Sequence, residues 1–287
     1  MPAVFGRELK SYFTTLTGYL FSAFMLVFAG IYTMAYNLNF GYPNFEYALR
    51  GMSFIFMIAV PVLTMRSIAD ERRQRTDQLL YSMPVSLSGV VWGKYFAMLA
   101  VFALPIVIML FYPLILSAYG TMNFATAYGS IAGFFFMGAA FIAIGLFISS
   151  LTENQAISAV LCFAVLLSNF FLTSLTEFVS ASAVATVVTL TVCILALSAL
   201  LYAMTKNTFA ALLFGVALEA ALLIVYASNA AALSGFLPAM MKKLSLFDRF
   251  NAFVDGIFDV TSLVFYAAVT FVFQYLTVQS LEKRRWI

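Results

Sequence analysis

The sequence predicts an all-α fold, a polytopic integral membrane bundle of about eight transmembrane helices with both termini in the cytoplasm. Of the 287 residues, 64% are hydrophobic and only 9% are charged, whereas about 25% of the residues of a soluble domain are charged. The apolar residues fall in runs of about 20, the length that crosses a bilayer as a helix. These runs lack the two-residue alternation of membrane-spanning strands. Lipid is therefore the expected solvent for most of the chain.

Eight apolar runs are the candidate spans, and they lie at 17–38, 47–66, 94–118, 126–150, 156–175, 183–204, 208–228 and 260–280. The boundaries of the three runs between 156 and 235 are the least sharply marked, so the count lies between six and eight. The fourth run holds small residues such as Gly129 and Gly133, whose spacing allows close helix approach. We expect that packing within the chain rather than between two copies.

The positive charges orient the bundle. With the N-terminus in the cytoplasm, eleven of the 15 lysines and arginines fall in cytoplasmic segments, as the positive-inside rule requires. Both ends are basic, which requires an even number of spans. The first run is long for a signal peptide and no small-x-small cleavage site follows it, so we expect it to be retained. The chain is thus expected in the cell (cytoplasmic) membrane, crossing it several times.

No second soluble domain is evident, so residues 1–287 are expected to form a single transmembrane domain. Residues 178–235 are rich in Ala, Val and Leu and poor in Phe, which indicates an inserted transmembrane hairpin. Residues 236–259 read as an extracytoplasmic amphipathic helix, because Phe247, Phe250, Val254 and Ile257 recur at steps of three and four. That helix either caps the bundle or takes a direct part in releasing a substrate.

The longest polar stretch, 66–94, carries the densest charge in the chain. Its charged residues come first, apolar residues and Pro84 follow, and the candidates for contact with a partner are Asp70, Glu71, Arg72, Arg73, Arg75, Thr76, Leu79 and Leu80. Mixed charge with a short apolar face is typical of a surface helix offered to a soluble partner. An ordinary positive-inside loop that only fixes topology explains the composition equally well.

The composition leaves little chemistry for catalysis. Histidine is absent, and Cys162 and Cys193 both lie in apolar runs, so an imidazole base, a metal site and a disulfide framework are not expected. Glu219, near the centre of the seventh run, is a lone intramembrane acid. It is either a substrate or proton contact or a protonated side chain hydrogen-bonded across helices. No G-x-x-x-x-G-K-[ST] motif for nucleotide binding occurs.

Four blocks resemble a known family: RELKSYF at 7–13 running on to Gly18-Tyr19, the stretch 61–94, SSLTENQ at 149–155, and 250–286. Together they resemble the membrane (permease) subunit of type-2 ABC exporters, in the branch of gliding-motility-type and copper-maturation-type permeases. The sequence departs from the family where Arg75 stands in place of a glycine before Thr76 and where Thr14–Thr17 replaces a Ser-Pro. Most members have six spans, so the hairpin at 178–235 is an addition.

The resemblance implies a non-catalytic subunit that dimerises, with itself or with a second permease, on a separate ABC ATPase subunit. ATP and Mg would be used by that ATPase, and this chain would bind no cofactor. Residues 1–16 would be a cytoplasmic elbow helix, and 67–90 would hold the coupling segment that docks on the ATPase. Phe163, Phe170 and Phe171 are candidates to line an apolar substrate path. An additional subunit with an extracytoplasmic domain is a further implied partner besides the bilayer, and nucleic acid is not.

Three rival functions remain open. An ATP-independent carrier often shows repeated halves and paired broken helices, and neither is evident here. A membrane anchor or scaffold subunit needs no coupling segment. A membrane-embedded enzyme would have to work without histidine and with a single intramembrane acid. The sequence does not identify the transported substrate.

Overall fold

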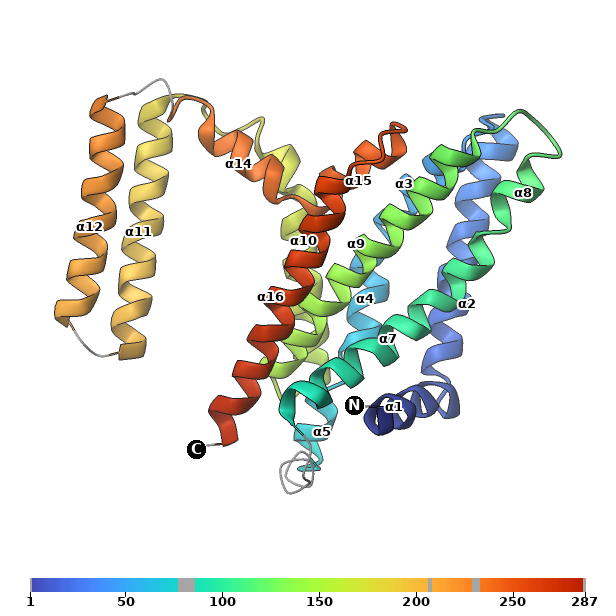
Figure 1. Cartoon of the computed structure of the whole chain (residues 1–287), viewed down its shortest axis with the longest axis horizontal. Coiled ribbons are helices and arrows are strands. Elements are labelled where there is room, and N and C mark those ends of the chain that lie inside the picture. Colours follow the sequence, from blue (N-terminus) through green and yellow to red (C-terminus); the bar gives the residue numbers. More distant parts are fainter. Residues whose placement is uncertain (1, 77–85, 206–207, 229–232, 286–287) are drawn as a thin grey trace. The chain divides into compact units, whose positions relative to one another are not determined.

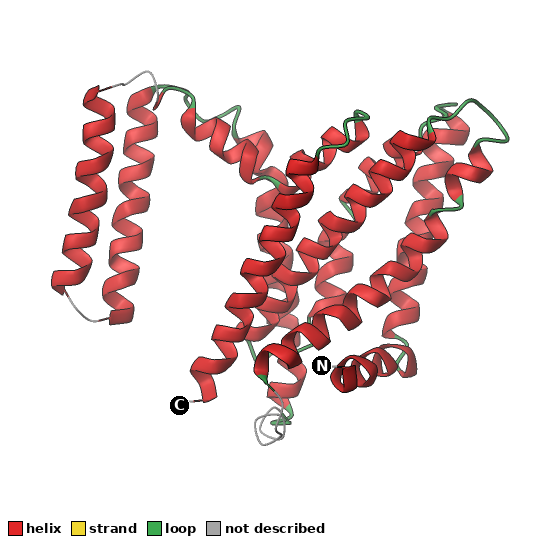
Figure 2. Ribbon diagram, in the orientation of Figure 1, coloured by secondary structure: helices red, strands yellow, loops and turns green. Residues whose placement is uncertain are grey.

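The computed structural model describes residues 2–76, 86–205, 208–228 and 233–285, and every regular element within these ranges is a helix (Figures 1 and 2). The chain divides into two compact units. Unit 1 comprises Met1–Ser168 with Leu246–Ile287, and unit 2 comprises Asn169–Ser245. The predicted hairpin, 178–235, lies within unit 2.

Unit 1 holds most of the helices: α1 (Pro2–Thr14), α2 (Thr17–Thr33), the π-helical η1 (Met34–Asn39), α3 (Phe45–Ser53), α4 (Phe56–Thr64), α5 (Ala69–Arg73), α7 (Leu87–Met109), α8 (Tyr112–Leu116), α9 (Phe124–Leu151), α15 (Leu246–Val254) and α16 (Val260–Arg285). Unit 2 holds α11 (Ala183–Thr205), α12 (Thr208–Ser228) and α14 (Phe236–Leu244). The helix α10 (Gln155–Leu175) runs from unit 1 into unit 2.

Within the described residues, five helical stretches are long and apolar enough to cross a membrane: Thr17–Asn39, Leu87–Leu116, Phe124–Leu151, Gln155–Leu175 and Val260–Lys283. A sixth span results if Phe45–Ser53 and Phe56–Arg73, which are bent by 59° at their break, count as one. The chain is therefore a multi-pass membrane protein. The other two of the eight predicted spans fall on α11 and α12, whose apolar stretches Ala183–Ala196 and Leu212–Ser228 are shorter. Eight spans and the orientation of the termini stay predictions.

The helix α9 forms the centre of unit 1. In its most apolar window, 78% of the residues are buried, against 17% for α10. It packs against α4, α7, α15 and α16. Aromatic rings fill the space around it, with the ring centroids of Phe56 and Phe134 4.5 Å apart and those of Phe141 and Phe247 4.8 Å apart. Both ring pairs are tilted, and their centroid separations lie in the range of favourable aromatic contacts.

Small residues let neighbouring helices approach α9. A Cβ atom at Gly133 would lie 2.7 Å from the ring of Phe253, and one at Gly145 would clash with Thr64. Both neighbours belong to the same chain, to α15 and α4. Gly133, one of the two glycines named from the sequence, therefore serves packing within the chain, and Gly145 does the same.

The segment 236–259 differs from the single amphipathic helix expected there. It forms two helices, α14 and α15, which are separated at Ser245. The second ends at a left-handed Gly256 (φ 82°), where Ile257 N–H donates to the carbonyl of Ala252 at 2.9 Å. This arrangement is a Schellman cap, for which glycine is the preferred residue. Ile257 therefore lies beyond the helix and is exposed, whereas the buried face of α15 packs on α3 and α9.

Candidate functional site

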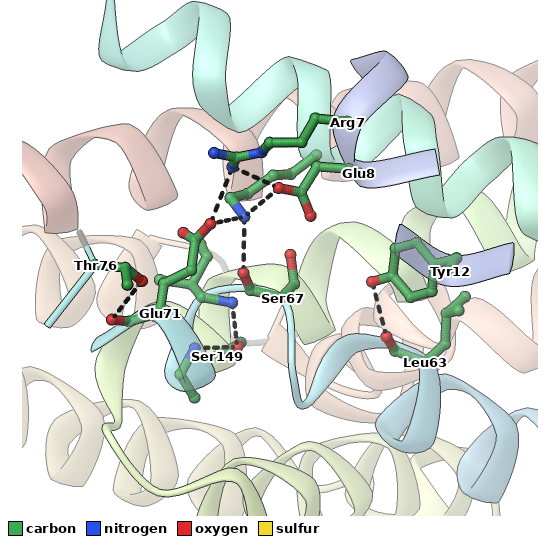
Figure 3. Close-up of polar contacts among 11 residues, drawn as sticks. Arg7, Glu8, Tyr12, Leu63, Ser67, Glu71, Thr76 and Ser149 are labelled. Atoms are coloured by element: carbon green, nitrogen blue, oxygen red, sulfur yellow. Dashed lines mark hydrogen bonds and ion pairs between the residues drawn. The ribbon is translucent and has the colours of Figure 1, made fainter. Parts of the chain in front are cut away.

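One end of unit 1 brings together the charged residues of three segments that are far apart in the sequence. The helix α1 packs against α7, and the short α5 follows α4 after a four-residue turn. Figure 3 shows the polar contacts that join them. This cluster is the candidate functional site, and it contains part of the polar stretch singled out from the sequence.

The ammonium group of Lys94 lies at the centre of the cluster. Its Nζ atom lies 2.8 Å from Glu71 Oε1 and 3.1 Å from Glu8 Oε1, and it donates to the carbonyl oxygen of Ser67 at 2.9 Å. An ammonium group has three hydrogens to donate, and here each finds an acceptor. The side chain is only 2% exposed, so the full set of partners compensates for its burial.

Arg7 completes a charge-balanced network of two cations and two carboxylates. Its guanidinium donates to Glu8 at 2.7 Å and to Glu71 at 3.1 Å. Partial burial alone would lower the pKa of Arg7, but the hydrogen bonds and negative charges of Glu8 and Glu71 outweigh it and raise the pKa. Arg7 therefore stays charged, and the network ties α1, α5 and the first turns of α7 together.

The end of α9 holds the start of α5. Ser149 Oγ accepts hydrogen bonds from the backbone N–H groups of Ile68 and Ala69, at 3.2 and 3.1 Å, and donates to the carbonyl of Met65 at 3.4 Å. The first N–H groups of a helix lack intrahelical partners. Ser149 thus supplies, from a distant helix, the acceptor that an N-cap side chain usually provides.

A further hydrogen bond joins α1 to the end of α4. The buried Tyr12 hydroxyl donates to the carbonyl oxygen of Leu63 at 3.2 Å. Burial raises the pKa of Tyr12, so the hydroxyl stays neutral and keeps its proton for donation. This bond holds α1 against α4, and the charge network holds α1 against α5 and α7.

The C-terminal end of α5 lies where the sequence has Arg75 and the family that it resembles has a glycine. Thr76 N–H donates to the carbonyl of Glu71 at 2.9 Å, and Arg75 N–H donates to that of Arg72 at 3.0 Å. This pair of bonds is a Schellman motif, which places its penultimate residue in the left-handed region. That residue is Arg75, with φ 56°. Glycine adopts this conformation without strain, which accounts for a glycine in the family pattern.

The residues predicted to contact a partner do not share one environment. Asp70 and Glu71 are half-buried and Arg72 is buried, whereas Arg73, Arg75 and Thr76 are exposed. Leu79 and Leu80 lie outside the described residues. Sequence reasoning missed the roles of Arg7, Glu8, Lys94 and Ser149 in this site. All four stood in the blocks that carry the family resemblance, and a lysine at the start of an apolar run was the signal available.

Glu219 lies in unit 2, where Thr191 Oγ1 donates to its carboxylate at 2.8 Å across the α11–α12 pair. The two residues line an apolar groove of about 530 Å³ between these helices. The contact is a hydrogen bond across helices, and both interpretations of Glu219 stay predictions. Of the residues considered for a substrate path, Phe163 and Phe171 are exposed and Phe170 is half-buried. Among the described residues, no group of three His, Cys, Asp or Glu side chains could hold a metal ion.

A comparison with known families places this geometry in context. The sequence profile described as ABC-2 family transporter protein matches residues 31–191, which is more than half of the chain and includes α5, Lys94 and Ser149. No curated protein and no solved structure matches the chain. Membrane components of this family are typically non-catalytic and generally pair with ABC ATPase subunits. The chain belongs to the ABC-2 transporter family, as a multi-pass membrane component of an ABC transporter.

Proposed function

We propose that this chain is the permease subunit of an ATP-driven type-2 ABC exporter, in the branch of gliding-motility-type and copper-maturation-type permeases. It forms the translocation path as a homodimer or as a heterodimer with a second permease. Both termini face the cytoplasm, eight helices span the membrane, and the segment 178–235 is a hairpin added to the six-span pattern. The separate ATPase binds ATP and Mg, and this chain binds neither.

The observation that carries the proposal is the attachment of α5 to three spans at once. α5 follows directly on α4, Lys94 holds it to α7 through Glu71, and Ser149 holds it to α9. Because packed helices transmit displacement as rigid bodies, a force on the exposed end of α5 would move all three spans. An ordinary loop that only fixes topology needs none of these contacts.

The exposed end of α5 is the proposed docking face for the ATPase. Arg73, Arg75 and Thr76 present two positive charges and a hydroxyl there. Complementary charges across an interface set the docking register and raise the association rate. Glu71 and Arg72 do not belong to this docking face, because Glu71 is part of the internal charge network and Arg72 is buried. Replacing these two residues would disturb the bundle as well as the contact with a partner.

The test separates docking from transmission in the complex with the ATPase, co-expressed and reconstituted in liposomes. Arg73→Glu combined with Arg75→Glu should abolish co-purification of the ATPase, because two attractive contacts become repulsive. Lys94→Met should retain co-purification but lose the stimulation of ATP hydrolysis by the permease. Lys10→Glu, a charge reversal at an exposed site on α1, is the matched control and should leave both unchanged. Normal docking and stimulation in the double variant would refute the proposal.

A further inference from the structure

A second feature at the same end of unit 1 adjoins the charge network and shares Arg7, Glu8 and Glu71 with it. A polar groove of about 430 Å³ runs between α1 and α5, and the far side of this groove is lined by Thr15, Thr17, Arg66 and Asp70. Thr17 begins the first membrane span. The groove therefore lies at the level where a span meets the lipid headgroups.

A separate apolar groove follows about one helical turn further along the chain segments of Thr17 and Arg66. On α2, Leu20, Phe21 and Phe24 follow Thr17 at steps of three, four and seven; on α4 and its extension, Ile58 and Val62 precede Arg66 at steps of eight and four. Residues at these steps share one face of a helix. The apolar residues line a cavity of about 190 Å³ between α2 and α4. The polar and apolar grooves thus lie one after the other along the same two segments, and they share no lining residue.

The polar part offers hydrogen-bond donors that the chain itself engages weakly. Arg66 contacts Thr17 Oγ1 at 3.4 Å and Asp70 at 3.9 Å, and its side chain is 45% exposed. Leu16 stands at the N-cap position of α2, where no side chain caps the helix. No side-chain oxygen at the N-cap position occupies the first N–H groups of α2, and helix starts are suited to anions. Guanidinium groups and helix starts both bind phosphate well, and phosphate is the anion that lipid headgroups supply at this level.

The charges around the groove also specify the rest of the ligand. Arg7, Glu8, Glu71 and Lys94 balance one another within the network, and Arg66 is balanced by Asp70. A groove without net charge suits a zwitterion better than an anion. The half-buried carboxylate of Asp70 lies one helical turn from Arg66, where it can accept hydrogen bonds from an ammonium group.

We propose that this double groove is a binding site for a glycerophospholipid with a primary amine in its headgroup, of the phosphatidylethanolamine class. Its phosphate binds Arg66, the Thr17 hydroxyl and the start of α2. Its ammonium group binds Asp70, and one acyl chain lies between α2 and α4 against Phe24 and Val62. Bound in this way, the lipid fills the corner between α1 and the first span.

Native mass spectrometry of the purified full chain tests the site with three lipids of identical acyl chains: phosphatidylethanolamine, phosphatidylcholine and phosphatidylglycerol. We expect one phosphatidylethanolamine bound about tenfold more tightly than either of the others, as a charge-assisted hydrogen bond allows. Phosphatidylcholine has no N–H to donate to Asp70. Phosphatidylglycerol has no cation to place there.

Single substitutions test whether phosphatidylethanolamine binds in this groove. Arg66→Gln and Val62→Phe should each weaken phosphatidylethanolamine binding by about tenfold, the first by removing the phosphate contact and the second by filling the apolar groove. Val62 is exposed at the groove, so the larger side chain leaves the core intact. Lys10→Gln removes an exposed cation of α1 outside the groove and should change nothing. Equal binding by the Arg66 and Lys10 variants, or tighter binding of phosphatidylglycerol, would overturn the assignment.

Discussion

The buried ammonium group of Lys94 gives the sharpest prediction about stability. In Lys94→Met the side-chain volume is kept, but the carboxylates of Glu8 and Glu71 lose their shared cation and the carbonyl of Ser67 loses its donor. Removing one partner of a buried ion pair costs about 3–5 kcal/mol. Glu8 and Glu71 keep 14% and 21% of their side-chain exposure and still contact Arg7, so we expect about 2–3 kcal/mol.

The assay is thermal unfolding of the purified chain in detergent, followed by circular dichroism. For a protein of this size, about 1 kcal/mol shifts the Tm by about 2–4 °C, so the Tm of Lys94→Met should fall by about 5–10 °C. Adding Glu71→Gln removes one of the two carboxylates and leaves Arg7 paired with Glu8. The double variant should therefore recover part of the loss, which a sum of independent effects cannot produce.

Two results would refute this reasoning. A Tm of Lys94→Met within experimental error of the unchanged protein would mean that the network contributes nothing to stability. Strictly additive losses in the double variant would mean that Lys94 and Glu71 do not interact. Either result would also remove the attachment of α5 to α7 on which the proposed function depends.

Three further predictions concern single elements. Ser149→Ala should lower the free energy of unfolding by about 1–2 kcal/mol, because two N–H groups at the start of α5 lose their acceptor. Ser150→Ala is the control, since its hydroxyl has no partner among the described residues. Equal Tm values for the two variants would contradict the capping role of Ser149. Arg75→Gly should stabilise the end of α5 by about 1 kcal/mol, since φ is 56° there, and a lower Tm would argue against the left-handed conformation. Hydrogen bonds from Ser262 and Thr261 lower the pKa of Asp259, so the start of α16 should lose stability as the pH falls below about 4. Hydrogen exchange should show this loss in the unchanged protein, and Asp259→Asn should abolish its pH dependence.

The sequence predicted the ends of several long helices in unit 1, because these helices coincide with apolar runs of span length. The first predicted span, 17–38, corresponds to Thr17–Asn39, and the last, 260–280, falls within Val260–Arg285. The run 47–66 shows where this reasoning stops. It is mostly apolar but includes Arg50 and Ser53, and the helix breaks at Phe54 and Ile55 and bends by 59°. Hydropathy measures composition along the chain and carries no signal for such a bend.

The candidate site was predictable only in part. A cluster of charges at 70–75 was visible, but the sequence could not divide it into exposed and buried members. That division depends on partners such as Glu8 and Lys94, which are 86 residues apart, and on Ser149, 80 residues beyond Ala69. Pairs at such separations are set by helix packing rather than by local pattern. Arg75 could be seen in the sequence as a departure from the family pattern, but only its left-handed φ value shows why a glycine suits that position.

In the proposed function, the exposed end of α5 is the contact with the ATPase. Site-specific photo-crosslinking in the co-expressed complex tests it most directly, with a photoreactive residue at Arg73 or, as the control, at Tyr119. Both positions are exposed, and Tyr119 lies in the turn between α8 and α9, away from α5 (Figure 1). We predict covalent capture of the ATPase from Arg73 and none from Tyr119. Capture from Tyr119, or none from Arg73 in an intact complex, would contradict the account.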